Sequence, residues 1–418
     1  MKSHPFWYEF LPTNQPVEFS QVNDDFETSL LVIGGGLSGL SCAYFALLHG
    51  AKVLVVESRG LCDGATGRNG GHQWGQTTSD PDTYSAESQC SAIESSDILE
   101  VRSFISSLDS DWQERISVTV SGGMDVCLKE ELIPHLVDYE SCVLNVDANE
   151  NHIKYEDGSD GGELPGNSLA GLLYPNAAHF NPGMLLLALA ETIVNLGGVI
   201  WTHAEVVGVV PLEKNLLEVH ILGKAEKKVQ VQCMNIAHCW NGYGNAKQFL
   251  PDRLSTVIES VRGQVVSLKN DHVSLGTTMV YKSTEDSLGE YLIKRNDRFI
   301  FGGMRHRCLN KGVGFQDDSQ PEQAVSEALL EEFNVFFKSN ETEISHAWSG
   351  IMCFPDDDRP IVGAIAELPN QFLSIGFGGH GMVRAFSCGK HIAELICGVP
   401  VSLPVISQVF NPNRFQQL

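Results

Sequence analysis

Several residue patterns that mark particular chemistries are missing from this chain of 418 residues. Its 11 cysteines include no C-x-x-C pair, and its 14 histidines include no H-x-x-x-H or H-E-x-x-H grouping. The sequence therefore predicts no metal site. Basic residues are also few: 28 Lys and Arg stand against 52 Asp and Glu, which gives a formal net charge of −24. Because such a surface repels phosphate groups, we expect no nucleic-acid partner, and solubility alone accounts for the charge.

Long apolar runs are absent as well. The most apolar stretches, such as residues 185–190, are far too short for a membrane span. The first seven residues lack the apolar core of a signal peptide, and the last four do not form the usual peroxisomal signal. Together with the odd number of cysteines, these absences favour a cytoplasmic protein with reduced thiols.

A nucleotide-binding pattern opens the chain after an aromatic arm at residues 1–28. Residues 29–33 read as a buried strand, 38–49 as a helix ended by a glycine, and 52–56 as a second buried strand. The glycines of a G-x-G-x-x-G fingerprint lie between the first strand and the helix, at Gly34, Gly36 and Gly39. This context predicts a tight turn, a close approach of backbone to pyrophosphate, and close packing of helix on strand. Glu57, at the end of the second strand, is placed to accept hydrogen bonds from a ribose diol.

Two further glycine-rich segments carry a family resemblance. The run G-A-T-G-R-N-G-G-H at residues 64–72 resembles the second flavin-contacting loop of the FAD-dependent amine and D-amino-acid oxidase family. It is especially similar to the branch that contains γ-glutamylputrescine oxidoreductase and its fungal relatives. Near the C-terminus, W-S-G-I at 348–351, R-P-I-V-G at 359–363 and G-F-G-G-H-G-M at 376–382 resemble the closing pattern of the same family. The resemblance covers nearly the whole chain and is weakest at residues 85–165.

The resemblance implies an α/β fold with FAD as cofactor. It implies a discontinuous Rossmann-like FAD-binding domain at 29–80, 168–212 and 342–418, and a β-sheet-rich substrate domain at 81–167 and 213–341. An apolar helix is expected at 182–196 and an acidic one at 322–338. A last helix would point its N-terminus at the flavin ring and stabilise the charge that develops there.

The predicted cofactor-binding residues fall in four groups. The first two segments supply Gly34, Gly36, Leu37, Ser38, Gly39, Glu57, Ser58, Arg59, Ala65, Thr66, Arg68, Asn69, Gly70 and Gly71. Val206 would contact adenine through its backbone, and the C-terminal run supplies Gly378, Gly379, His380, Gly381 and Met382. Arg68 either adds charge near the cofactor or serves the structure alone. We expect the flavin to be bound without a covalent bond, with Cys353 acting as a small buried hydrophobic residue.

The family chemistry moves a hydride from the carbon of a C–N bond to flavin N5 and leaves an imine. His72, His380 and Tyr291 are the catalytic candidates, and Trp74, Met352 and Phe354 are candidates for the substrate pocket. His72 could hold the amine or help to deprotonate it, or it could be structural.

The substrate would be a small amine or amino acid, and oxygen or another acceptor would reoxidise the flavin. Where relatives often carry a lysine that promotes the reaction with oxygen, the residue here is Ile300, which keeps a dehydrogenase with another acceptor open. A trafficking or assembly factor with vestigial activity is the alternative from a different class of protein. The oligomeric state is left open.

Two absences bear on the substrate. Relatives that oxidise free α-amino acids hold the carboxylate with a cation at positions that read Met352 and Val383 here. Because an unpaired buried carboxylate is costly, the sequence predicts amines without a carboxylate on the reacting carbon. Arg305, Arg307 and Arg384 are the cations that could reach the site from another direction.

Overall fold

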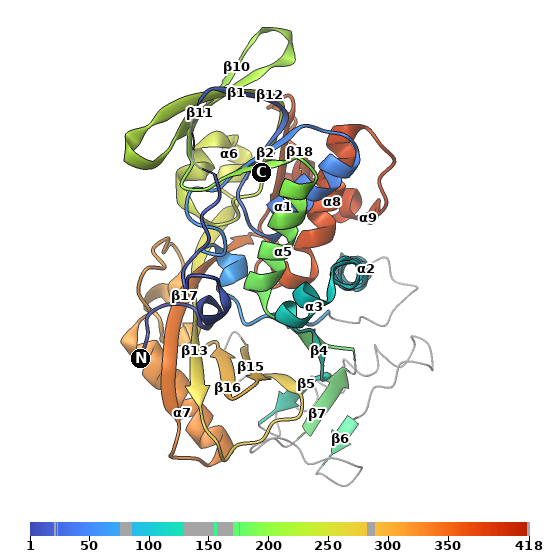
Figure 1. Ribbon diagram of the computed structural model, residues 1–418. Helices are drawn as coiled ribbons and strands as arrows, with labels where there is room; N and C mark the ends of the chain where they lie inside the picture. Colours follow the sequence, from blue (N-terminus) through green and yellow to red (C-terminus); the bar gives the residue numbers. More distant parts are fainter. Residues whose placement is uncertain are drawn as a thin grey trace.

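The computed structural model describes residues 1–20, 22, 24–75, 86–128, 154–156, 170–174, 176–281 and 289–415. Two eight-stranded sheets dominate this part of the chain, one in the upper half of Figure 1 and one in the lower half. Each sheet combines strands from distant parts of the sequence, so the chain crosses between the two sheets several times. Among the helices of these ranges, none has both the length and the apolar character needed to cross a bilayer.

The first sheet has the order β10-β11-β12-β1-β2-β9, and β19 joins β12 and β18 beside it. Its strands are β1 (Phe26–Ile33), β2 (Val53–Val56), β9 (Val199–Trp201), β10 (Glu205–Pro211), β11 (Leu217–Leu222), β12 (Lys228–His238), β18 (Ile361–Ala364) and β19 (Gln371–Ile375). The pairs β1–β2, β1–β12, β2–β9 and β12–β19 are parallel. The carboxyl ends of these strands therefore share one edge, which is where ligands bind in sheets of this kind.

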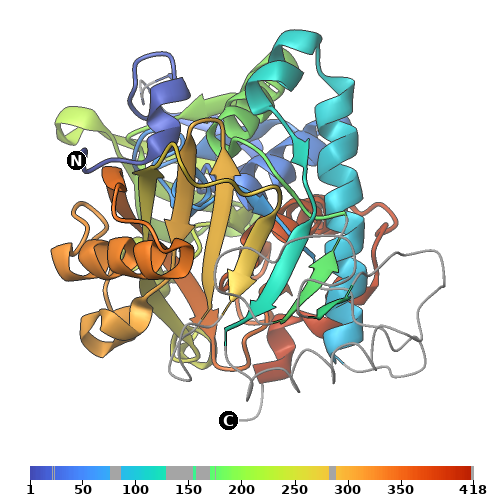
Figure 2. The ribbon, with the colours of Figure 1, turned by 90° about the horizontal axis from the view of Figure 1, so that it is seen from below.

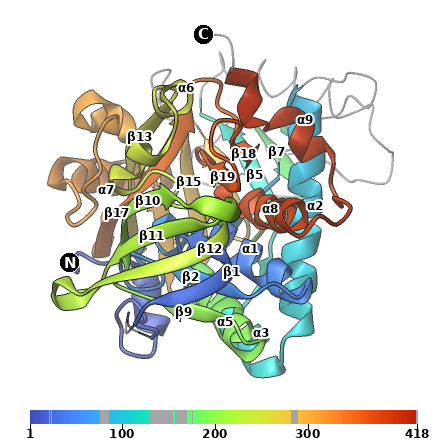
Figure 3. The same cartoon turned by 90° about the horizontal axis from the view of Figure 1, so that it is seen from above.

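Helices cover one face of the first sheet. These are α1 (Leu37–Leu48), α2 (Ala86–Ser107), α3 (Ser110–Ile116), α5 (Pro182–Asn195), α8 (Ala385–Cys397) and α9 (Val405–Val409). In the view from above, most of them gather on one side of the strands (Figure 3). Alternation along β1 explains the arrangement, because Leu30 and Val32 pack with the helices while Leu31 and Ile33 pack in the core on the opposite face. Helix α1 and the apolar helix α5 confirm the expectations for 38–49 and 182–196 within one residue.

The second sheet has the order β17-β13-β16-β15-β14-β5-β7-β6. Its strands are β5 (Gly123–Cys127), β6 (Lys154–Glu156), β7 (Ala170–Tyr174), β13 (Ile258–Lys269), β14 (Thr278–Tyr281), β15 (Glu290–Arg295), β16 (Arg298–Gly302) and β17 (Glu343–Pro355). Helix α7 (Gln323–Phe337), the expected acidic helix, packs against its outer face through Leu329 and Phe333 (Figure 2). The inner face is left for the cavity described below.

A three-stranded sheet of β3 (His72–Gln73), β8 (Ala178–His179) and β4 (Thr119–Val120) lies apart from these two sheets, and α6 (Asp252–Ser255) is a single turn. The aromatic arm packs on the body as expected. Phe6, Trp7 and Tyr8 are buried, whereas Phe10 is 38% exposed. The indole nitrogen of Trp7 donates to the carbonyl of Asn69 at 2.6 Å, so the arm braces the loop at 64–71.

The structure departs from the predicted division of the chain in four segments. Strands β11 and β12 belong to the first sheet, although 213–341 was assigned to the substrate domain. Conversely, β7 and β17 lie in the second sheet. Helix α2 packs on α8 of the first layer. Periodicity marks a strand but not its partners, which are set by hydrogen bonds between distant segments. Much of 81–167, including 129–153 and 157–167, lies outside the described residues.

Candidate active site

A cavity of about 590 Å³ lies between the carboxyl edge of the first sheet and the inner face of the second. Residues at the ends of β1 and β2 form one side, and side chains of β13, β14, β15 and β17 form the other. Predicted residues that line it are Gly34, Gly36, Leu37, Ser38, Glu57, Ser58, Arg59, Ala65, Thr66, Arg68, Asn69, Gly70, His72, Trp74, Val206, Tyr291, Met352, Phe354, Gly378, Gly379, His380, Gly381 and Met382. Segments more than 300 residues apart in the sequence thus meet in one cavity.

Gly39 and Gly71 are the two predicted cofactor-binding residues outside this lining. A Cβ on Gly39 would overlap the carbonyl oxygen of Gly34, so this glycine lets α1 pack against the turn before it. Gly71 has a φ of +79°, and a Cβ there would overlap the carbonyl oxygen of Phe180. Both glycines shape the backbone next to the cavity without facing it.

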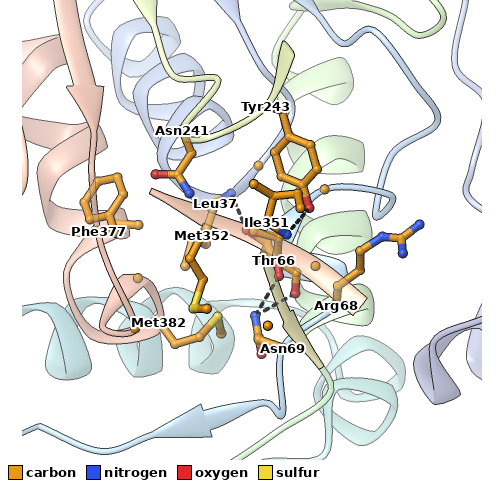
Figure 4. A pocket seen from close by; sticks show the side chains of 18 of the residues that line it. Leu37, Thr66, Arg68, Asn69, Asn241, Tyr243, Ile351, Met352, Phe377 and Met382 are labelled. Atoms are coloured by element: carbon orange, nitrogen blue, oxygen red, sulfur yellow. Dashed lines mark hydrogen bonds between the residues drawn. The ribbon is translucent and has the colours of Figure 1, made fainter. Parts of the chain in front are cut away.

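The start of α1 lies at the cavity without a side-chain cap. Gly34 has a φ of +109°, which L side chains rarely adopt, and its N–H donates to the carbonyl of Val56 at 2.8 Å. The N-cap residue Gly36 supplies no side-chain cap to the helix. The N–H of Leu37 donates to Thr66 Oγ1 at 3.1 Å, which ties the first glycine turn to the second loop (Figure 4). The positive end of the helix dipole therefore faces the cavity at this point.

Glu57 connects the turn between β1 and α1 to the turn that follows β2. Its carboxylate accepts from the N–H of Gly35 at 2.8 Å and from the N–H of Arg59 at 2.9 Å. It lines the cavity at the carboxyl end of β2. The carboxylate also holds the turn between β1 and α1 in place.

The guanidinium of Arg68 is engaged within the protein. It forms ion pairs with Asp63 and Asp318 and donates to the carbonyl of Ser349 at 2.9 Å. Figure 4 shows it directed away from the other labelled side chains. Of the two roles considered for this residue, the contacts support the structural one. Arg59 likewise pairs with Asp318, at 3.0 Å.

The C-terminal glycine run forms the third wall. Gly376 and Gly378 have φ values of +78° and +52°, and the N–H of Gly378 donates to the carbonyl of Cys353 at 2.8 Å. A short 3-10 turn follows at 381–383, and α8 starts only at Ala385. The last helix expected from the sequence therefore begins after this turn. Its first turn is capped by Asp97 of α2, which accepts from the N–H of Ser387 at 2.6 Å. The backbone that faces the cavity here is therefore the 3-10 turn.

The histidines of the cavity are neutral near pH 7. Burial and the neighbouring His179 lower the pKa of His72 to about 3. Burial and Arg384 lower the pKa of His380 to about 4. His72 Nε2 is buried and, within the described part of the chain, makes no hydrogen bond. Its ring lies 6.0 Å from that of Tyr291. A neutral imidazole in this setting can accept a hydrogen bond from a substrate N–H but is a weak base.

Sequence reasoning missed the residues after β12. Asn241 Oδ1 accepts from the N–H of Gly376 at 3.1 Å, and Tyr243 Oη accepts from the N–H of Ile351 at 3.1 Å. Both line the cavity and connect the first sheet to the C-terminal segment (Figure 4). The alternation of Val229, Val231 and Cys233 in β12 was a signal, but it did not show that this strand lies beside β1.

The family model for FAD dependent oxidoreductases, DAO, matches residues 29–395. The chain belongs to this family. It is 23% identical to the probable oxidoreductase OrdL of Haemophilus influenzae, over 99% of this chain and 93% of that protein. It is 24% identical to γ-glutamylputrescine oxidoreductase of Escherichia coli, over 95% of this chain and 90% of that protein. The crystal structure of glycine oxidase from Geobacillus kaustophilus superimposes with a TM-score of 0.73 at 17% identity, covering 90% of this chain and 96% of that one.

FAD, the cofactor of the DAO family, fits the residues present. An added Cβ at Gly36 would meet only Thr66 Oγ1, at 3.4 Å, so the open side of this glycine faces the cavity. The uncapped start of α1 suits the pyrophosphate, and Glu57 suits a ribose. Cys353 packs in the apolar core with Ile361 and is not among the cavity residues of the described chain. This placement agrees with binding that needs no thioether.

Replacing Glu57 should weaken FAD binding. We expect Glu57→Ala to cost about 1.5–3 kcal/mol of FAD binding free energy, the range for a hydrogen bond to a charged group. Glu57→Gln, which keeps one acceptor oxygen, should lose less. Titration of the apoprotein with FAD, followed by quenching of flavin fluorescence, measures both. Equal affinity in the wild type and Glu57→Ala would place the ribose elsewhere.

Proposed function

We propose that this DAO-family enzyme oxidises the C–N bond of a small amine to an imine. The observation that carries the proposal is the cavity shared by the carboxyl edge of the first sheet and the inner face of the second. FAD, when bound, supplies the hydride acceptor at N5. The chain's own residues orient the substrate, and the apolar walls formed by Met352 and Phe354 exclude water from it.

His72 and Tyr291 lie on the wall that faces the loop at 64–71. A Cβ on Gly70 would overlap the Tyr291 ring, so this ring lies directly against the loop. The substrate nitrogen must be unprotonated for hydride to leave. A neutral imidazole whose Nε2 makes no hydrogen bond within the described chain supports a role for His72 as the acceptor for that nitrogen. Because the imidazole is a weak base, we assign it to holding the amine rather than to removing its proton.

Anaerobic mixing with a panel of amines tests the function. Loss of the absorbance of oxidised flavin with one of them supports it. A protein that binds FAD but is reduced by dithionite and by no amine would favour the alternative of a vestigial site. Opening the reduced sample to air, or adding a quinone, then identifies the acceptor. Ile300, at the position considered for an oxygen-promoting lysine, is fully buried in an apolar cluster with Trp7 and Trp348.

The substrate class gives a second test. Val383 and Met352 line the cavity, and neither can pair with a carboxylate. Arg384 is buried and bound to Glu94, and Arg307 is not among the lining residues of the described chain. We therefore expect an amine to show a kcat/KM at least about tenfold above that of its α-carboxylated counterpart, since an unpaired buried carboxylate costs more than about 1.4 kcal/mol.

Arg305 is the one candidate cation of the three that lines the cavity, where it lies 5.2 Å from the centre of the Phe354 ring. Arg305→Gln is thus the decisive comparison. We expect it to leave the preference for the amine intact. A clear preference for the amino acid that disappears in Arg305→Gln would show that this arginine binds an α-carboxylate and that the substrate proposal is wrong.

A further inference from the structure

Asp125 of β5 places a carboxylate on the cavity side of the second sheet. In register across β15, β14 and β5, Tyr291 lies opposite Val280, and Val280 lies opposite Asp125. All three line the cavity. The flanking residues of β5, Met124 and Val126, are buried in the core beneath α7. Alternation along β5 therefore turns Asp125 toward the cavity. Asp125 is the far member of a row of three residues, and Tyr291, the near member, lies against the loop at 64–71.

Aromatic rings surround this end of the row. Gly123, two residues from Asp125 on the same face, pairs with Tyr174 of β7. A Cβ on Gly123 would lie 2.7 Å from Trp74 Cε3, so the indole rests on this strand. The rings of Trp74 and Tyr174 are 5.1 Å apart at their centres, and both line the cavity. A carboxylate beside aromatic faces is the setting that proteins use to bind an organic cation.

The arginines that line the cavity within the described part of the chain lie on its other walls. Arg59 and Arg68 are paired with Asp318 on the nucleotide side, and Arg305 lies over Phe354 beyond the end of β16. Tyr291 and Asp125 are two strands apart, which is about 10 Å at the usual strand spacing. A substrate whose reacting carbon lies near Tyr291 and the flavin loop would thus need an extended chain to reach Asp125.

We propose that Asp125, Trp74 and Tyr174 form a subsite for a second cationic group of the substrate, so that the enzyme selects extended diamines or polyamines over monoamines. This inference rests on the proposed amine oxidation and names the substrate class of that same site. Asp125 would pair with the distal ammonium, and the two rings would cover its methylene chain and its charge.

Binding and turnover of matched ligands test the subsite. Linear α,ω-diamines of increasing length are compared with monoamines of equal length, by calorimetry on the FAD-bound protein and by anaerobic flavin reduction. In the wild type we expect the best diamine to bind about 10- to 100-fold more tightly than its monoamine. Asp125→Asn should remove most of this difference by weakening the diamine, while monoamine binding stays within about twofold. For turnover, the loss should appear in KM rather than kcat.

Asp297→Asn is the matched control, because Asp297 is exposed on the β15–β16 hairpin and pairs with Arg298 at 2.6 Å. Trp74→Leu against Trp74→Phe provides a second pair, and only the variant without a ring should lose diamine affinity, by about 3- to 10-fold. Equal binding of diamines and monoamines by the wild type, or a preference that survives Asp125→Asn, overturns the subsite. Calorimetric selectivity for diamines without any flavin reduction would retain the subsite and overturn the proposed oxidation instead.

Discussion

Gly36→Val should yield a folded protein that has lost its flavin. The valine side chain would occupy the space on the open side of Gly36, where the pyrophosphate must approach the start of α1. Losing two or more hydrogen bonds to a charged group corresponds to at least about 3 kcal/mol, or more than about 100-fold in the dissociation constant for FAD. Absorbance of the purified protein near the flavin bands and titration of the apoprotein measure the effect.

Two other glycine variants separate binding from folding. Gly276→Ala is the neutral control, because no atom lies within 4 Å of an added Cβ and the residue is outside the cavity lining. Gly34→Ala should instead destabilise the protein, since its φ is +109° and its Cβ would lie 2.7 Å from the carbonyl oxygen of Cys239. If Gly36→Val retained a full complement of FAD, the dinucleotide site would have to lie elsewhere.

Glu94→Gln should be among the most destabilising single changes in the chain. Glu94 of α2 and Arg384, at the start of α8, form a buried ion pair at 2.6 Å, with side chains 1% and 8% exposed. Removing one charge leaves the guanidinium buried and poorly compensated, which typically costs about 3–5 kcal/mol. Urea unfolding of the FAD-bound protein should therefore show a much lower midpoint. Because Arg384 follows the 3-10 turn at the cavity, we also expect weaker FAD binding.

The control is Asp111→Asn on α3, whose exposed pair with Arg115 should contribute no more than about 1 kcal/mol. Arg384→Met in the Glu94→Gln background should recover much of the lost stability, because it removes the unpaired charge. A Glu94→Gln variant as stable as Asp111→Asn would show that α2 is not held to α8 by this pair.

The first βαβ unit was predictable from the sequence because its parts are consecutive along the chain. Strand, glycine turn, helix and acidic strand end occupy residues 29–57, and each local pattern specifies its own element. The family resemblance added the loop at 64–72 and the run at 376–382, and the structure brings both to the cavity. The packing of Trp7 and Tyr8 also followed from composition, since such side chains seek burial.

Features that depend on pairing between distant segments were not predictable. The role of Asp125 depends on β5 lying beside β14 and on which face each strand turns inward. The ion pair of Glu94 with Arg384 joins residues 290 positions apart, in the region where the resemblance is weakest. Asn241 and Tyr243 reached the cavity because β12 pairs with β1 rather than with the second sheet.

The sequence by itself determined the first βαβ unit with its dinucleotide-binding fingerprint, and the glycine segments that resemble those of a flavin site. These features are local, because backbone conformation and helix polarity follow from neighbouring residues. The tertiary structure alone decided that Arg68 is held by Asp63 and Asp318, and that Asp125 and Trp74 line the far end of the cavity. The charge state of a side chain depends on its burial and on its interaction partners. Both are set only once distant strands have paired.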